Sequence, residues 1–280
     1  MQITRSLITF ILEPYAMQLL QRLHGFFNPR ADQSALDHLP AETEVSDAVF
    51  QQYSVVIGSL FSYFNDLPVE SKRKFVKRVC QFQASKKFHF IGLENNDDIA
   101  ILVSASAIQL TFGLNNYMMS YFKDIYVLAD AYQMDNEEEL YIGHVAPDGI
   151  YLSFKHFLHG YSHKRKNDNV NVAVHEMSHA LLYNNFFAQY GGTDSHFRLN
   201  YEKFSSSTGP ILANVIANRR SYLRSYAFSN LHEFWAVSVE AFFENPAGLK
   251  SNMPELYEAL CRVLNQDPNT KTKILKSELW

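Results

Sequence analysis

The stretch NVAVHEMSHALLYNN, Asn171 to Asn185, contains two histidines four residues apart, with a glutamate directly after the first. His175, Glu176 and His179 therefore form an H-E-x-x-H pattern. Residues four apart lie on one face of a helix, so both imidazoles can bind a single ion while the glutamate reaches water beside it. Two surface histidines on an ordinary helix would give the same pattern. The apolar residues on both sides favour a buried helix instead, in which each imidazole requires a polar partner.

A complete zinc site requires a third protein ligand, and its position can be tested by spacing. The longer pattern H-E-x-x-H-x-x-G-x-x-H is excluded, because Leu182 and Asn185 stand at its glycine and histidine positions. Glu202 lies at a separation typical of a ligand glutamate, but Ser206 stands where an aspartate would follow. Glu202 therefore remains the weaker candidate for the third ligand.

A stronger candidate lies in SYAFSNLHEFWAVSVEAFFENP, residues 225 to 246, where Glu233 and Glu240 are seven residues apart on one face of an apolar helix. Burying a carboxylate there costs on the order of several kcal/mol unless a metal or a charged partner offsets it. Glu233 fits the third ligand. Glu240 fits a residue that orients a histidine ring, a structural salt bridge or a solvated edge of the helix. His232 points about 100° away from Glu233 on a helix and is expected at the rim of the site.

The spacing of apolar residues predicts the order of the elements along the chain. Helices are expected over Ile3–Leu23 with a kink near Pro14, Val45–Phe64, Val69–Ala84, Ile99–Phe112 capped by Asp97, Val170–Asn184 capped by Asn167 or Asp168, Phe197–Arg219, Leu231–Glu244 and Pro254–Leu264. Strands are expected over Phe88–Ile91, Asp124–Leu128 and Gly149–Phe154. This order predicts an α+β fold, mainly helical with a small mixed sheet. An N-terminal helical segment, residues 1–66, is expected to pack on residues 67–280 as part of one continuous domain.

The composition is that of a globular protein, with 47% apolar and 19% charged residues in 280. A formal net charge of -4 argues against binding nucleic acid through bulk electrostatics. The chain has two cysteines, Cys80 and Cys261, which favours a reducing compartment. It has no apolar stretch of the roughly 18 residues that a membrane span requires. These features predict a soluble, cytoplasmic protein without a membrane span or a nucleic-acid partner.

Taken together, the two polar segments resemble the Mlc titration factor A family of zinc peptidases, also called glucose-regulated metallopeptidases. That family pairs an H-E-F-A-H-like helix with a later segment resembling Y-x6-E-F-F-A-V-x-S-E-x-F-F-E-x-P. The corresponding stretches here read VHEMSHALL and YAFSNLHEFWAVSVEAFFENP. KRKFVKRVCQFQASKKFHFIG and GIYLSFKHFLHG resemble further parts of the family, so the likeness covers roughly residues 67 to 265. It implies a zincin-like peptidase fold. Leu182 departs from the family, which often has aspartate there.

The resemblance implies a role for each matching residue. His175 and His179 match the histidine ligands, Glu233 matches the third ligand, and Glu176 matches the catalytic base. Tyr226, seven residues before Glu233, matches a tyrosine that stabilises the transition state. From composition alone it would be one of 16 tyrosines with a packing role. The resemblance implies one zinc ion per chain and a peptide or protein as substrate.

The family name suggests a second function, because it comes from the sequestration of a transcriptional repressor. The alternative is therefore a regulatory binding protein that acts on a protein partner. The intact set of Glu176, Glu233 and Tyr226 favours retained chemistry, since a pure binder would not require it.

A substrate-binding role is also expected for the predicted strand Gly149–Phe154. Ile150, Tyr151 and Leu152 lie within it, and an extended peptide could pair with its backbone. This expectation depends on the strand lying at the edge of the sheet, above the cleft.

Overall fold

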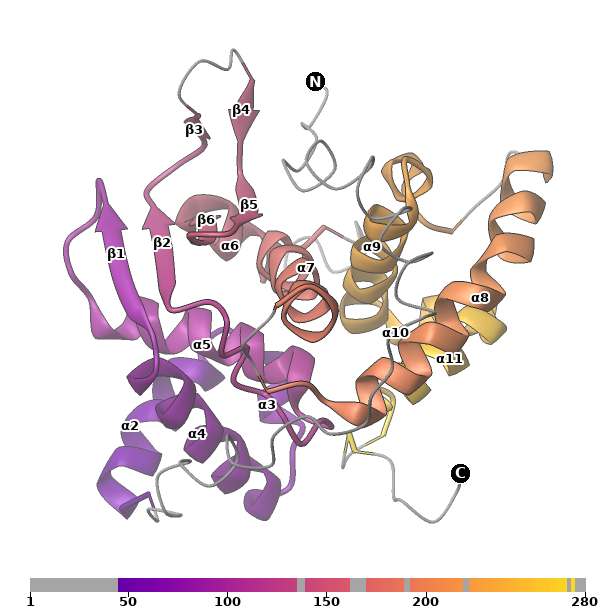
Figure 1. The fold of residues 1–280 in the computed structure, drawn as a ribbon. Coiled ribbons are helices and arrows are strands. Elements are labelled where there is room, and N and C mark those ends of the chain that lie inside the picture. Colours follow the sequence, from indigo (N-terminus) through magenta and orange to yellow (C-terminus); the bar gives the residue numbers. More distant parts are fainter. Residues whose placement is uncertain are drawn as a thin grey trace.

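A four-stranded sheet lies beside a group of packed helices in this computed structural model (Figure 1). The structure describes residues 45–134, 139–161, 170–188, 192–218, 222–270 and 273–274, with backbone alone for residues 211–218. The helix expected over Ile3–Leu23 lies outside these residues. Within the described part of the chain, no helix combines the length and the apolar character that crossing a membrane requires.

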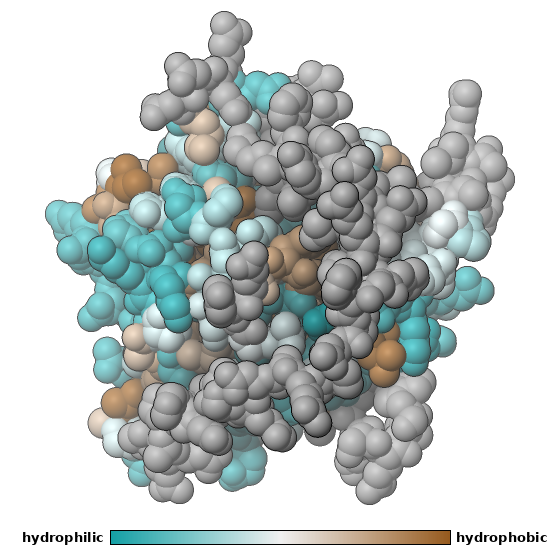
Figure 2. Space-filling view, viewed as in Figure 1, coloured by the Kyte–Doolittle hydropathy of each residue, from teal (hydrophilic) through white to brown (hydrophobic). Residues whose placement is uncertain are grey.

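The main sheet has the strand order β1-β2-β6-β5. Its strands are β1 (Lys87–Ile91), β2 (Asp124–Leu128), β6 (Gly149–Ser153) and β5 (Gly143–Ala146). β1, β2 and β6 are parallel, and β5 is antiparallel to β6. A separate antiparallel pair is formed by β3 (Tyr132–Gln133) and β4 (Leu140–Tyr141). In Figure 2, hydrophilic residues cover the part of the surface where Figure 1 draws β1 and β2.

The position of β6 corrects one expectation from the sequence. The stretch Gly149–Phe154 was expected at the edge of the sheet, but β6 is an interior strand, bonded to β2 on one side and to β5 on the other. A peptide therefore has no free backbone edge to pair with on β6. The edge strand next to β6 is β5, which is short and begins with a glycine, so its sequence carries little strand signal.

Helices make up most of the described chain. They are α2 (Asp47–Gly58), α3 (Ser62–Asn65), α4 (Val69–Ala84), α5 (Asp97–Thr111), α6 (Phe154–Gly160), α7 (Val172–Phe186), α8 (Ser195–Asn218), the 3-10 helix η3 (Ser225–Phe228), α9 (Leu231–Glu244), α10 (Pro246–Asn252) and α11 (Pro254–Leu264). The prediction of a mainly helical α+β fold with a small mixed sheet is confirmed. The bounds predicted for α4, α9 and α11 match those observed.

The prediction of a single helix over Val45–Phe64 is wrong in one respect, because the structure has two helices, α2 and α3, in this stretch. α2 ends at Gly58, and Phe61 has an extended backbone with φ −97° and ψ 97° before α3 begins. The side chain of Asn65 donates a hydrogen bond of 2.8 Å to the carbonyl of Gly58, which is left free where the helix stops. Glycine is a poor helix former, which is consistent with the end of α2 at this residue.

The capping residues also differ from those predicted. Asn96, not Asp97, caps α5, and its Oδ1 accepts a hydrogen bond of 2.8 Å from the backbone N–H of Asp98. Asn171 caps α7 through a 3.1 Å hydrogen bond from the N–H of Val174 to its Oδ1. The candidate caps Asn167 and Asp168 lie outside the described residues. The helices α5 and α7 therefore begin a short distance from their predicted first residues, Ile99 and Val170. Asparagine is among the residues most favoured at the N-cap position, which explains the shift.

The helix α7 lies in the core of the protein. α7 packs against α5, α9, β5 and β6, and every residue from Val172 to Leu182 is buried. Figure 1 shows α7 and α9 beside each other. α2 and α3 contribute Phe50, Ile57 and Phe64 to the same hydrophobic cluster. Polar side chains on the facing sides of α7 and α9 are therefore enclosed by protein.

Candidate metal centre

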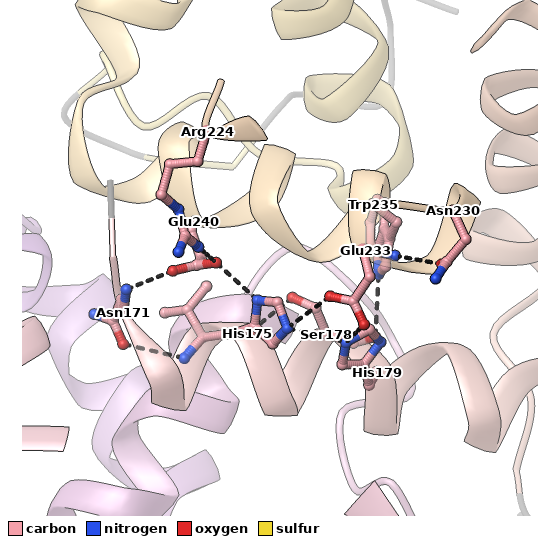
Figure 3. Close-up of polar contacts among 10 residues, drawn as sticks. Asn171, His175, Ser178, His179, Arg224, Asn230, Glu233, Trp235 and Glu240 are labelled. Atoms are coloured by element: carbon pink, nitrogen blue, oxygen red, sulfur yellow. Dashed lines mark hydrogen bonds and ion pairs between the residues drawn. The ribbon is translucent and has the colours of Figure 1, made fainter. Parts of the chain in front are cut away.

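The two histidines of the H-E-x-x-H pattern lie one turn apart on α7 and point toward α9 (Figure 3). His175 is 8% exposed and His179 is 2% exposed. Their Nε2 atoms are 3.1 Å apart. The imidazoles therefore converge, as the spacing of four residues predicts for a helix.

Glu233 reaches the same point from the first turn of α9. Its backbone N–H donates a 3.0 Å hydrogen bond to the side chain of Asn230, which caps this helix. One carboxylate oxygen lies 3.1 Å from Nε2 of His175, and the other lies 3.6 Å from Nε2 of His179. The α9 helix is fixed to α7 nearby, because Trp235 Nε1 donates a 3.1 Å hydrogen bond to the carbonyl of Ser178.

The donor set fits a divalent metal ion. His175, His179 and Glu233 each offer one ligand atom, and these atoms all lie within 4.8 Å of one another. Two ligands of a tetrahedral zinc ion, each about 2.0 Å from the metal, would be about 3.3 Å apart. The 3.1 Å between the two Nε2 atoms agrees with that spacing. The carboxylate of Glu233 reaches both imidazoles with different oxygens, 3.1 Å from His175 and 3.6 Å from His179. Two imidazoles and a carboxylate are also the ligand types of catalytic zinc sites.

Glu240 holds the other side of the His175 ring. Its Oε1 lies 2.7 Å from Nδ1 of His175, and its Oε2 accepts a 2.6 Å hydrogen bond from the N–H of Asn171. Arg224 forms an ion pair with the same carboxylate. A carboxylate on Nδ1 favours the tautomer with the proton on that nitrogen, which leaves the Nε2 lone pair directed at the metal position. Both interactions left open for Glu240, with a histidine and with a cation, are thus present.

Burial and charge shift the pKa values of these groups in opposite directions. Burial on its own would lower the pKa of His175, but Glu240 and Glu233 together raise it well above its ordinary value. Burial on its own would raise the pKa of Glu233, but His179 and His175 bring it well below its ordinary value. The carboxylates therefore favour a positive charge at this centre, and a metal ion would supply that charge without a proton on His175.

Glu176 lies beside the ligands but faces β5. It is 4% exposed, and its Oε2 has no hydrogen-bond partner within the described ranges. Burial raises the pKa of this carboxyl to about 7. Gly143 of β5 lies against it, since a Cβ at that position would be 2.7 Å from Cγ of Glu176.

Tyr226 and His232 border the centre. Tyr226 belongs to η3, is partly buried, and has its ring centroid 6.1 Å from that of His175. His232 is also partly buried, and burial, reinforced by His179, lowers its pKa to about 4. His232 is therefore neutral at physiological pH.

Other candidates from the sequence lie away from the three ligand atoms. Glu202 is exposed on α8 and does not belong to the group of possible metal ligands. Ile150 and Leu152 of β6 are fully buried in the core. Tyr151 lies on the opposite face of β6, and its ring stacks on those of Tyr126 and His144.

Sequence reasoning missed several residues that contact the centre. Arg224, Asn171, Asn230 and Gly143 each touch a ligand, its partner or Glu176. For the two asparagines a signal existed, because each stands directly before an apolar helical segment. For Arg224 and Gly143 there was none, because their contacts join segments distant in the chain.

Comparisons with known proteins agree with this centre. Residues 44–264 match the family described as glucose-regulated metallo-peptidase M90. The chain is also similar to a protein of Synechocystis, "Uncharacterized protein slr2042", with 23% identity over an alignment of 234 residues; the match covers 77% of this chain and 84% of that protein. Because the family match covers most of the chain and includes both α7 and α9, the protein belongs to the glucose-regulated metallopeptidase family.

Proposed function

We propose that this protein is a zinc-dependent peptidase with a zincin-like fold that hydrolyses peptide bonds in a peptide or protein substrate. The observation that carries the proposal is the convergence of two imidazoles from α7 and one carboxylate from α9 at a single buried point. The family match, which indicates a metallopeptidase, supports it.

His175, His179 and Glu233 would hold one zinc ion per chain. A zinc ion bound by three protein groups keeps an open position, lowers the pKa of water there to about 7, and polarises a carbonyl oxygen. Glu240 keeps the His175 ring oriented through its 2.7 Å contact with Nδ1. The enclosed site excludes bulk water, which strengthens each of these interactions.

Glu176 would move the proton in this reaction. Its free oxygen and its pKa of about 7 suit a group that accepts a proton from the attacking water and then delivers it to the leaving amine. Its position next to His175 in the sequence keeps it within reach of the metal site without making it a ligand.

Tyr226 would stabilise the negative charge that develops on the substrate oxygen. Its ring stands beside that of His175, on the side of the centre formed by η3. A hydroxyl donor aimed at that oxygen is typically worth about 3 kcal/mol in the transition state. Replacement by phenylalanine should therefore lower kcat and leave zinc binding intact.

The substrate would pair with β5 rather than with β6. The carbonyl of Ile142, just before β5, accepts a 2.9 Å hydrogen bond from Ser153. Because backbone groups alternate along a strand, those of Gly143 and Val145 then face away from β6. No strand within the described ranges pairs with that side of β5. Gly143 and Val145 are buried, so an extended peptide that adds to the sheet there would displace the atoms that cover this edge.

The experiment combines metal analysis with peptidase assays on purified variants. Glu176→Gln should keep one equivalent of zinc and lose hydrolysis, whereas Glu233→Gln should lose the zinc. Glu202→Gln is the matched control, because this glutamate is exposed on α8, and it should keep both zinc and activity. Unchanged hydrolysis by Glu176→Gln would rule the proposal out.

A further inference from the structure

Three buried carboxylates lie close together around the centre. Glu176, Glu233 and Glu240 are 4%, 1% and 1% exposed. A divalent metal ion would offset two of their three negative charges, with both histidines neutral. Burying the remaining charge without a partner costs on the order of several kcal/mol. A further cation near the metal ligands would offset this charge.

Arg224 is that cation. Its guanidinium forms an ion pair with Oε1 of Glu240, the oxygen that also contacts Nδ1 of His175 (Figure 3). The Arg224 side chain is 26% exposed, so it reaches inward from near the surface. Glu240 has a third partner in the N–H of Asn171, which fixes the carboxylate between α7, α9 and Arg224.

Arg224 also lies directly before the short helix that carries Tyr226. It occupies the N-cap position of η3, and its carbonyl accepts a 3.0 Å hydrogen bond from the N–H of Ala227. The ring of Tyr226 stands 6.1 Å from that of His175. One ion pair therefore fixes both the orientation of a metal ligand and the segment that holds Tyr226 beside it.

The second histidine has no equivalent support. Nδ1 of His179 is buried and has no hydrogen-bond partner within the described residues. Of the two Nδ1 atoms, only that of His175 is thus held by a hydrogen-bond partner within the described residues, and that partner is Glu240. A substitution that weakens the contacts of Glu240 should therefore also disturb the orientation of His175 and weaken metal binding.

We propose that Arg224 is a positioning residue of the metal centre, which holds Glu240 against His175 and ties the Tyr226 segment to the metal-binding helix. This inference rests on the proposed function only in its kinetic part. Its effect on metal binding is independent of whether the protein hydrolyses peptides. Residues that orient a metal ligand typically change metal affinity by about 10- to 100-fold when replaced.

The test compares Arg224→Gln and Arg224→Lys with a matched control, Arg73→Gln. Arg73 also forms an ion pair, 2.9 Å from Asp47, but both side chains are largely exposed, at 45% and 85%. Zinc affinity is measured by competition with a chelator, and the geometry of the site by the visible spectrum of the protein loaded with Co²⁺. Arg224→Gln should bind zinc about tenfold more weakly or worse and change the Co²⁺ spectrum. Arg224→Lys, which keeps the charge, should recover most of the affinity, and Arg73→Gln should match the parent protein.

Kinetics supply a second readout. In zinc-saturated protein, Arg224→Gln should lower kcat with little change in KM, and adding Tyr226→Phe should cause little further loss because both act through one segment. If Arg224→Gln does not fold, Arg224→Gln combined with Glu240→Gln takes its place, since it removes both charges. Parental zinc affinity in the folded variant would overturn the proposal. A parent protein that binds zinc but cleaves no peptide would instead refute the proposed function and leave the metal-binding result standing.

Discussion

Gly143 of the edge strand lies directly against Glu176 of the metal-binding helix. A Cβ at position 143 would stand 2.7 Å from Cγ of Glu176 and 2.8 Å from Cγ2 of Val172. Both separations are shorter than van der Waals contact allows. Any other residue would therefore push β5 and α7 apart, at the point where the proposed proton carrier meets the proposed substrate strand.

Gly143→Ala should lower kcat by about 100-fold, because a shift of about 1 Å in a catalytic group can have that effect. The three atoms nearest to the new methyl group belong to Glu176 and Val172 and not to His175, His179 or Glu233, so zinc content should stay at one equivalent. Steady-state kinetics and metal analysis of the same preparation check both expectations. Full activity would contradict this prediction, because it would show that β5 can move to accommodate the methyl group without displacing Glu176.

The matched control for this change is Gly209→Ala. Gly209 is exposed on α8, and a Cβ there would have nothing within 4 Å. Alanine is a better helix former than glycine by about 1 kcal/mol, but Pro210 follows directly and disfavours the helical backbone at a preceding residue that has a Cβ. The two effects oppose each other, so this variant should unfold close to the denaturant concentration of the parent protein. Its kcat should equal that of the parent protein.

The convergence of His175, His179 and Glu233 was largely predictable, because the positions of these residues follow local rules. The spacing of His175 and His179 fixes their shared helical face, and two carboxylates in the apolar segment around Glu233 require a charged partner. The edge strand and Arg224 were not predictable, because β5 is only four residues long and the Arg224–Glu240 pair joins two different elements. The residues before 45, the cytoplasmic location and the regulatory partner stay predictions from the sequence.

Asn230→Ala tests how the third ligand is held. Loss of a helix cap costs about 1 kcal/mol of unfolding free energy, and here the cap bonds the N–H of Glu233 itself. We therefore expect weaker zinc binding, by about tenfold, together with the loss of stability. Chelator competition and urea unfolding give the two values.

Asn96→Ala separates these two effects. Asn96 caps α5 in the same way, through a 2.8 Å hydrogen bond with the N–H of Asp98. It should lose a similar unfolding free energy, about 1 kcal/mol, with unchanged zinc affinity. Equal losses of zinc affinity in both variants would mean that stability alone, and not the position of Glu233, controls metal binding.

Removing the metal should destabilise the protein. A ligand that binds only the folded state at 100 times its Kd adds about 2.7 kcal/mol to the unfolding free energy. Chelator treatment should remove that amount, as measured by urea unfolding with and without zinc. Glu202→Gln should show the same difference, and Glu233→Gln should show almost none. A parent protein whose stability does not respond to the chelator would contradict the assigned ligands.

The pairing of substrate with β5 predicts an alternating pattern in modified peptides. Gly143 and Val145 direct their backbone groups away from β6, so only every second residue of a paired peptide can bond to them. N-methylation removes one donor, and a hydrogen bond is worth about 1 kcal/mol, so KM should rise about fivefold at those residues. Methylation of the residues between them should leave KM unchanged. A series of peptides methylated one residue at a time, assayed at equal zinc content, measures this pattern. A uniform rise along the peptide would indicate a steric effect and exclude strand addition at β5.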